Sequence, residues 1–297
     1  EQLPRLADSD WQEIPGLCYA PAGEHFHLGQ SQRVDMRALP PLVWPGDWLS
    51  RHRHHHHRFD SNSFSGPGAE VESSRGCPFQ CSFCAKEEYR GGYRRRPKPA
   101  VLTELDHLIS QGCTYVYFID EIFLPDSQLL EALLDRPLKF GIQTRIDLWG
   151  RDELELLGAA GCVSVEAGVE SVTPEGRRQL NKPGLLTSEE LADLLIFAKR
   201  YVPFVQANLV RTPADEPQQT AEWRRRVIAA GVWANDPVPL FIYPGSPAYK
   251  ARWGEPDGWA WERAHQHYLL ENPRLCDLQS EAPLSLSELE LARGCGG

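Results

Sequence analysis

The sequence predicts an α/β fold, a partial (β/α)6 barrel, and three observations support this. Short β-prone runs alternate with stretches of helical periodicity from about residue 69 onward. Proline, glycine and capping residues mark the ends of the helical stretches. Six strands separated by five helices require parallel pairing through right-handed crossovers. Because six units are too few to close an eight-stranded barrel, we expect an open one.

The elements can be placed in chain order. The expected strands cover residues 69–74, 114–120, 138–146, 162–170, 203–210 and 236–243. The expected helices cover residues 99–112, 127–135, 151–161, 187–201 and 218–231. Pro99 opens the first helix, and Thr187 with Glu190 forms a capping box before the fourth. Glycines close three of the helices, namely Gly112, Gly161 and Gly231.

Composition divides the 297-residue chain into three parts. Residues 1–65 are dense in proline and glycine and predict an irregular lead-in. Residues 66–250 hold the repeating units, and residues 251–297 predict a short helical extension with a flexible end. The chain begins with Glu1 rather than methionine, so we expect it to be a piece of a longer protein.

Charge and hydropathy exclude several classes of protein. The net charge of −10 argues against indiscriminate binding of nucleic acid. No run of 18 apolar residues is present, so no membrane-spanning helix is expected. The start of the chain has neither the basic segment nor the apolar segment of a secretion signal, which favours a cytoplasmic protein with reduced thiols.

Three of the eight cysteines lie close together in the stretch "CPFQCSFC", as Cys77, Cys81 and Cys84. Three thiolates on one loop can hold a cube of iron and sulfide and leave one iron without a protein ligand. A zinc site is the alternative, but it needs a fourth ligand, which His25, His27 or the His54–His57 run could supply. Two further cysteines, Cys113 and Cys162, stand just ahead of apolar runs, where a packing role is expected.

The cysteine stretch resembles the CxxxCxΦC loop of the radical S-adenosylmethionine (radical SAM) enzymes, with Phe83 as its aromatic residue. That family has a TIM-like barrel, and its loop follows the first strand, as the predicted loop does here. The resemblance implies a [4Fe–4S] cluster that chelates S-adenosylmethionine through its amino and carboxylate groups. One-electron reduction, from a partner such as flavodoxin or ferredoxin, then yields a 5′-deoxyadenosyl radical.

Other strand ends agree with the resemblance. The segment "YFIDEIF" resembles the one that meets the methionine amino group, which points to Asp120 and Glu121. In "GIQTRID", Gln143 and Arg145 end the third strand, and an arginine there suits a carboxylate. Glu170 ends the fourth strand, where the family often binds the ribose hydroxyls. The fifth strand departs from the pattern, because "LVRTPADE" lacks the usual glycine, and no residue is assigned there.

Two further segments resemble the subgroup that carries a cobalamin-binding domain. "FIYPGSPAY" is similar to its "PGTP" turn, and "IPGLCY" followed by "LPPLVWP" is similar to the linker that follows the cobalamin domain. The resemblance implies that the cobalamin domain has been removed. It also implies cobalamin-dependent methyl transfer to an unactivated centre of a small-molecule substrate. In this mechanism one S-adenosylmethionine methylates cobalamin, and a second supplies the radical that abstracts a substrate hydrogen.

Other functions are kept open. One is a radical SAM oxidoreductase, cyclase or isomerase without methyl transfer. A methylthiotransferase is disfavoured, since it needs three more upstream cysteines and only Cys18 is there. From a different class, a zinc-binding module could contact nucleic acid through the basic stretch Arg90–Lys98. That stretch and the five histidines of His52–His57 could also face an anionic substrate, or they could be solvated loops.

Overall fold

The computed structural model describes residues 17–19, 27–28, 34–51, 67–86 and 92–272. The chain forms two compact units, residues 1–40 and residues 41–297. In the first unit, β1 (Cys18–Tyr19) pairs antiparallel with β2 (His27–Leu28), and Met36 is buried. The second unit holds all remaining elements. The predicted boundaries after residues 65 and 250 stay predictions.

The second unit is built on a parallel sheet with the strand order β10-β9-β8-β7-β6-β3. Its strands are, in chain order, β3 (Gly68–Val71), β6 (Tyr115–Phe118), β7 (Lys139–Thr144), β8 (Cys162–Glu170), β9 (Phe204–Leu209) and β10 (Trp233–Ala234). Every neighbouring pair is parallel. This confirms the predicted α/β class. Within the described ranges no ladder joins β3 to β10, so these two strands are the edges of an open sheet.

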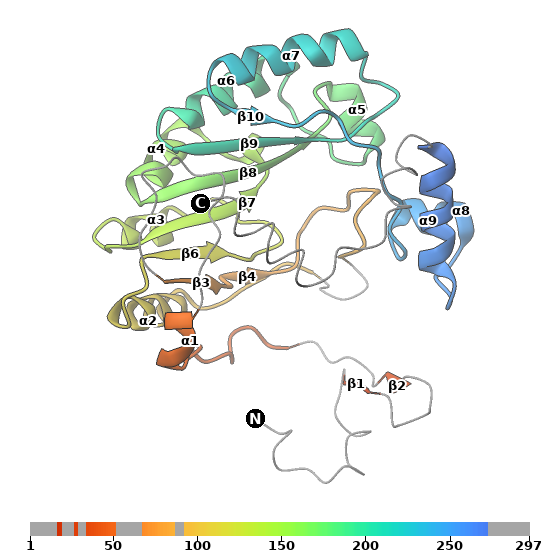
Figure 1. The fold of residues 1–297 in the computed structure, drawn as a ribbon. Coiled ribbons are helices and arrows are strands. Elements are labelled where there is room, and N and C mark those ends of the chain that lie inside the picture. Colours follow the sequence, from red (N-terminus) through yellow and green to blue (C-terminus); the bar gives the residue numbers. More distant parts are fainter. Residues whose placement is uncertain (1–16, 20–26, 29–33, 52–66, 87–91, 273–297) are drawn as a thin grey trace. The chain divides into compact units, whose positions relative to one another are not determined.

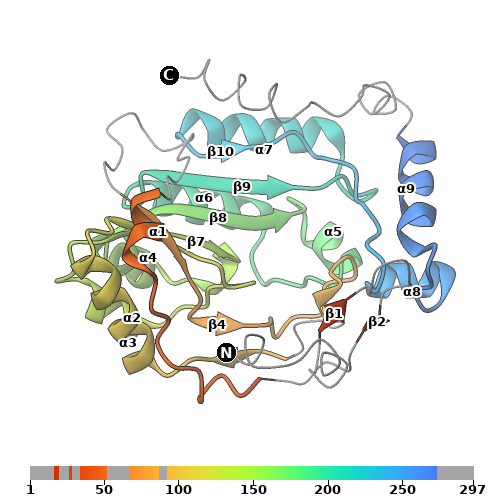
Figure 2. The same ribbon diagram turned by 60° about the horizontal axis from the view of Figure 1, so that its bottom comes forward.

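Helices cover one face of the sheet and bury the hydrophobic core against it (Figures 1 and 2). These helices are α2 (Lys98–Ser110), α3 (Ser127–Leu133), α4 (Arg151–Ala159), α6 (Ser188–Lys199) and α7 (Pro217–Ala229). The short helix α1 (Gly46–Arg51) lies near the amino ends of the strands and adds Leu49 to the core. Alternate strand residues such as Val116, Ile142 and Val165 point into this core and are fully buried. Because successive side chains point to opposite faces, Tyr117, Gln143 and Glu166 lie on the other, polar face, which is the inside of the open barrel.

The predicted helix boundaries agree with the structure to within about two residues. Thr187 caps α6, since its hydroxyl accepts from the Glu190 N–H while the Glu190 carboxylate accepts from the Thr187 N–H. Gly112, Gly161 and Gly231 follow their helices with φ of 86°, 100° and 88°. These are left-handed conformations that favour glycine.

Two strand predictions were wrong in detail. The run at 69–74 divides into β3 and β4 (Ser74–Arg75), and β4 pairs antiparallel with β5 (Arg94–Arg95). The sixth strand is at Trp233–Ala234, whereas the predicted run at 236–243 makes only an isolated bridge between Val238 and Val210. Pro237 and Pro239 explain this, because a proline has no N–H to donate to a ladder.

The chain after β10 runs along the carboxyl ends of the strands toward two further helices, α8 (Pro247–Trp253) and α9 (Ala260–Glu271) (Figure 1). Tyr249, Ala260 and Ala264 form a small core between them. The predicted helical extension is therefore present as far as the structure describes it. Two short helices were not predicted, α1, which lies in the lead-in expected to be irregular, and α5 (Pro174–Gln179); the 3-10 turn at Ile146–Leu148 was not predicted either.

No helix among the described residues is long and apolar enough to span a membrane.

Candidate active site

The cysteine loop follows β3 and β4 at the carboxyl edge of the sheet, and three backbone contacts hold it in place. The Ser82 N–H donates to the Leu180 carbonyl over 2.9 Å, and the Ser82 carbonyl accepts from the Ala248 N–H over 2.8 Å. The Asn181 side chain donates to the Gln80 carbonyl over 2.6 Å. Two distant segments of the chain, at residues 180–181 and at residue 248, therefore fix one loop of eight residues, as the tight geometry of a metal-binding loop requires.

Cys77, Cys81 and Cys84 are free thiols, and all three are half-buried. Burial raises the pKa of the Cys77 and Cys81 thiols, and the charge of the nearby Lys182 opposes this rise at both. Phe83 lies between the second and third cysteines and is also half-buried. The loop turns tightly there, since the Cys84 N–H donates to the Cys81 carbonyl over 3.1 Å.

The described residues fit an iron–sulfur cluster. No three His, Cys, Asp or Glu side chains in the described ranges gather closely enough to hold a single metal ion. A cube of iron and sulfide needs one thiolate at each of three corners rather than three at one point, so half-buried thiols spaced along a loop suit it. Cations beside the loop suit the negative charge of thiolate ligands. Of the histidines considered as zinc ligands, those at positions 25 and 54–57 lie outside the described residues, and His27 lies in β2.

Asp120 and Glu121 both contact the chain that leads into the cysteine loop. The buried Asp120 carboxylate accepts from the Ser73 N–H over 2.8 Å, from the Ser73 hydroxyl over 2.6 Å, and from the Ser74 hydroxyl. Burial raises its pKa to about 6, against the opposing effect of these donors. One Glu121 oxygen accepts from the Gly76 N–H over 2.6 Å, directly before Cys77. The predicted contact of both acids with a methionine amino group stays a prediction.

Arg145 lies in the same region, and one nitrogen of its guanidinium makes no hydrogen bond to the described residues. Its guanidinium pairs with Asp147 over 2.7 Å, donates to the Pro183 carbonyl over 2.8 Å, and lies 4.4 Å from the centre of the Phe79 ring. Its remaining terminal nitrogen, Nη1, is buried and has no hydrogen-bond partner among the residues that the structure describes. A buried donor without a partner is costly, and its presence at the cysteine loop marks a place for an acceptor.

Gln143 stands at the end of β7, with an exposed side chain whose amide donates to the Glu121 carbonyl over 3.3 Å. This contact links the ends of β6 and β7 at the same edge of the sheet. The contact engages the side-chain amide nitrogen of Gln143 as a donor, and the predicted role of Gln143 in binding S-adenosylmethionine stays a prediction.

Glu170 is paired with a lysine that sequence reasoning missed. The Lys182 ammonium lies 2.9 Å from a Glu170 oxygen and donates to the Gly168 carbonyl over 2.7 Å. Lys182 is only 5% exposed. Glu170 has φ of 62°, an unusual conformation for a residue other than glycine. The only sequence signal for Lys182 is the turn "NKPG", in which Asn181 also has positive φ and directs the chain back to the strand ends.

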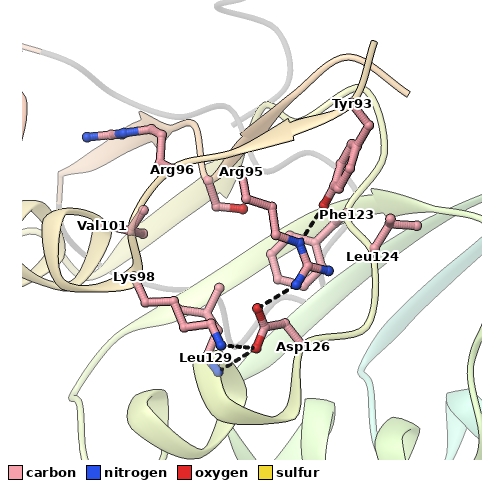
Figure 3. A pocket seen from close by; sticks show the side chains of 10 residues that line it. Tyr93, Arg95, Arg96, Lys98, Val101, Phe123, Leu124, Asp126 and Leu129 are labelled. Carbon is pink, nitrogen blue, oxygen red and sulfur yellow. Dashed lines mark hydrogen bonds and ion pairs between the residues drawn. The ribbon is translucent and has the colours of Figure 1, made fainter. Parts of the chain in front are cut away.

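The basic stretch that a nucleic-acid module would use is described from Gly92 onward, and Arg95, Arg96 and Lys98 form ion pairs within the chain. Figure 3 shows Arg95 and Lys98 directed at Asp126, each at 3.0 Å. Arg96 is buried against Glu104 at 2.7 Å. These ion pairs join β5 and α2 to the start of α3. They therefore hold the segment that follows the cysteine loop against the barrel.

Cys113 and Cys162 are buried away from the loop, at 2% and 1% exposure. Their thiols donate to the carbonyls of Tyr115 and Ser164. Burial raises the pKa of both thiols, which keeps them neutral and unreactive. The predicted packing role fits these positions.

Comparisons with known proteins place this site in a family. A family model described as the Radical SAM superfamily matches residues 71–223. The anaerobic magnesium-protoporphyrin IX monomethyl ester cyclase of Cereibacter sphaeroides is 27% identical over 186 residues, 59% of this chain and 30% of that protein. The hopanoid C-2 methylase of Rhodopseudomonas palustris is 30% identical over 128 residues, 38% of this chain and 24% of that protein. The chain thus spans less than a third of the length of these relatives.

Solved structures agree on the fold. The cobalamin-dependent S-adenosylmethionine radical enzyme OxsB has a TM-score of 0.58 at 15% identity, over 86% of this chain and 42% of that chain. The methyltransferase TsrM of Kitasatospora setae has a TM-score of 0.52 at 19% identity, over 62% and 38%. The family match covers just over half of the chain and includes all three cysteines of the loop. The chain therefore belongs to the radical SAM superfamily.

Proposed function

We propose that Cys77, Cys81 and Cys84 bind a [4Fe–4S] cluster at which S-adenosylmethionine is cleaved, and that the whole protein uses this chemistry for cobalamin-dependent methyl transfer. The observation that carries the proposal is the fixed loop of three free thiols beside Arg145 and Lys182. Bound there, the cluster would supply one electron to the sulfonium of S-adenosylmethionine, drawn from an external reductant such as flavodoxin or ferredoxin.

Two buried cations would receive the methionine carboxylate. Both Arg145 and Lys182 lie close enough to Cys81 to act on the charge of its thiol. The unpartnered Nη1 of Arg145 is the donor that an incoming carboxylate oxygen would satisfy. Charge-assisted hydrogen bonds of this kind are about twice as strong as neutral ones, and a planar guanidinium also fixes the direction of the carboxylate.

The acids at the strand ends would complete the binding of S-adenosylmethionine. Glu121 is held at the first cysteine through Gly76, where an ammonium group on an adjacent ligand would lie within reach of its carboxylate. Glu170 is fixed by Lys182 at the end of β8, where its second oxygen could accept from a ribose hydroxyl. Asp120 would act through the backbone instead, since its carboxylate ties Ser73 and Ser74 at the start of the loop.

The relatives support methyl transfer as the overall reaction. Several are methylases by name, among them the hopanoid C-2 methylase, and OxsB and TsrM are described with cobalamin. Cobalamin would carry the methyl group between S-adenosylmethionine and the substrate. A second candidate function is a ring-forming or oxidising reaction without methyl transfer, which the similarity to a cyclase favours.

The first experiment is anaerobic reconstitution with iron and sulfide, followed by reduction in the presence of S-adenosylmethionine. We expect absorbance at about 400 nm from thiolate-bound iron and the formation of 5′-deoxyadenosine. Cys77→Ala should lose both signals. Cys113→Ala is the matched control, because this buried cysteine lies outside the loop and should keep both. A colourless protein that binds zinc and leaves S-adenosylmethionine intact would refute the proposal and favour the binding module.

A second experiment separates methyl transfer from the cyclase reading. Reduced cobalamin is added with S-adenosylmethionine to the full-length protein, and methylcobalamin is followed by its absorption spectrum. Methylcobalamin that forms only with this protein supports methyl transfer. Formation of 5′-deoxyadenosine without methylcobalamin would favour the reaction without methyl transfer.

A further inference from the structure

Four aromatic rings gather where the segment after β10 meets α9, and we call them the aromatic platform: Phe241, Tyr243, Trp261 and Tyr268. The centre of the Phe241 ring lies 4.9 Å from Tyr243, 6.3 Å from Trp261 and 5.4 Å from Tyr268. The Tyr243 and Trp261 rings meet edge to face at 6.0 Å. Figure 1 shows α9 beyond the carboxyl ends of the strands, which is the end of the sheet that carries the cysteine loop.

The platform is open to solvent in a way that core aromatics are not. Trp261 is 63% exposed and Tyr243 is 48% exposed, while Phe241 and Tyr268 are half-buried behind them. All four side chains are aromatic, and no carboxylate, ammonium or guanidinium group is among them. Large aromatic surfaces that stay exposed next to one another commonly mark binding sites, and flat ring faces favour flat, uncharged groups.

The platform is joined to the cysteine loop through a single short stretch. Tyr243 begins a turn in which the Ser246 N–H donates to its carbonyl over 3.0 Å, with Gly245 at φ of 86°. Ser246 then caps α8, and Ala248 donates to Ser82 in the cysteine loop. Since a β-turn spans less than about 7 Å, the backbone of Tyr243 lies on the order of 15 Å from Ser82. One mid-sized molecule could reach from the platform to the loop.

We propose that the aromatic platform binds a flat, uncharged ring in the substrate, and that Tyr243 and Trp261 provide the contact faces. This rests on the proposed function, which it deepens by naming the substrate class. Offset and edge-to-face contacts with aromatic rings favour planar groups over puckered ones of similar size. The cations at the cysteine loop would receive S-adenosylmethionine, while the uncharged platform selects the ring of the second substrate.

The test measures binding of indole, a flat uncharged ring, to the cluster-containing protein by ligand-observed NMR. Cyclohexanol, which is uncharged and puckered, is the comparison probe. We expect indole to bind more tightly than cyclohexanol, and Trp261→Ala and Tyr243→Ala each to weaken indole binding about fivefold through lost ring contacts. Trp259→Ala is the matched control, since Trp259 is 69% exposed but makes no ring contact in the described platform. It should leave binding unchanged.

Three results would overturn the proposal. If Trp261→Ala and Tyr243→Ala both bind indole as tightly as the wild type does, the indole ring binds at another place on the protein. Equal binding of cyclohexanol would remove the selectivity for flat rings. A wild-type dimer that becomes a monomer in Trp261→Ala, as measured by sedimentation, would make a second copy the occupant. The binding test needs no S-adenosylmethionine, so failure of the platform is distinguishable from failure of the proposed function, which would appear as absent 5′-deoxyadenosine in wild-type protein.

Discussion

Removal of the Lys182 side chain should destabilise the protein through the charge that it leaves behind. The Lys182–Glu170 side chains are 6% and 14% exposed and lie 2.9 Å apart. In Lys182→Met the Glu170 carboxylate stays largely buried without its cation, and the Gly168 carbonyl loses a donor as well. Breaking a buried pair from one side costs about 3–5 kcal/mol. Because Glu170 keeps some contact with water, we expect the lower end, about 3 kcal/mol.

A double-mutant cycle isolates this effect. Glu170→Gln should also cost about 3 kcal/mol, because it leaves the buried Lys182 ammonium without its anion, although the neutral amide can still accept a hydrogen bond. The double substitution leaves no buried charge, so its cost should fall below the sum of the single costs by about 2 kcal/mol.

The assay is guanidinium unfolding of cluster-free, reduced protein, in which Lys182→Met should lower the midpoint by on the order of half a molar. Arg178→Met is the matched control, since its ion pair with Glu175 is exposed and contributes little. A loss below about 1 kcal/mol for Lys182→Met, or costs that simply add, would refute the reasoning.

Two further predictions concern stability. Burial raises the pKa of Asp120 to about 6, next to the charge of Glu72, so the native state binds the proton more tightly than the unfolded state does. This contribution to stability is fully present below about pH 4 and is lost as the pH rises through about 6. The wild type should therefore lose about 3 kcal/mol of stability relative to Asp120→Asn between pH 4 and 7. A difference in stability between the two proteins that does not change with pH, as measured by urea unfolding, would contradict this. Gly161→Ala should cost more than Gly112→Ala, because both have positive φ but only at Gly161 would a Cβ meet a backbone atom, the Leu138 carbonyl oxygen at 2.6 Å. Thermal unfolding of the two glycine variants measures these costs. Equal losses of stability would show that the contact with the Leu138 carbonyl oxygen is relieved without cost.

Local patterns were sufficient for most of the fold. The parallel sheet and five helices follow from hydrophobic period and from helix ends, which are local in the sequence. The sixth strand failed because an apolar run was interpreted as a strand despite its two prolines. Phe241 and Tyr243 in that run instead pack against α9, a contact that depends on how the extension folds back.

The site was predictable only in part. The cysteine spacing lies within one short stretch, so the loop could be recognised directly. Lys182 could not, because it comes from the turn after α5 and reaches Glu170 only through the tertiary fold. The partners of Asp120 were missed for a related reason. Its side chain is satisfied by Ser73 and Ser74, which follow β3 and precede the loop, and β3 is the strand that pairs with β6.

The contacts of Ser82 have a consequence for the order in which the protein can mature. The cysteines are synthesised early, yet the groups that hold their loop, at Leu180 and Ala248, are synthesised much later. At about 5–20 residues per second, a ribosome needs on the order of ten seconds or more to reach Ala248 after the loop has been made. During this interval the thiols are on an unfixed segment and are open to oxidation or to stray metals. Delivery of iron and sulfide would therefore succeed best after the α8 segment has left the ribosome.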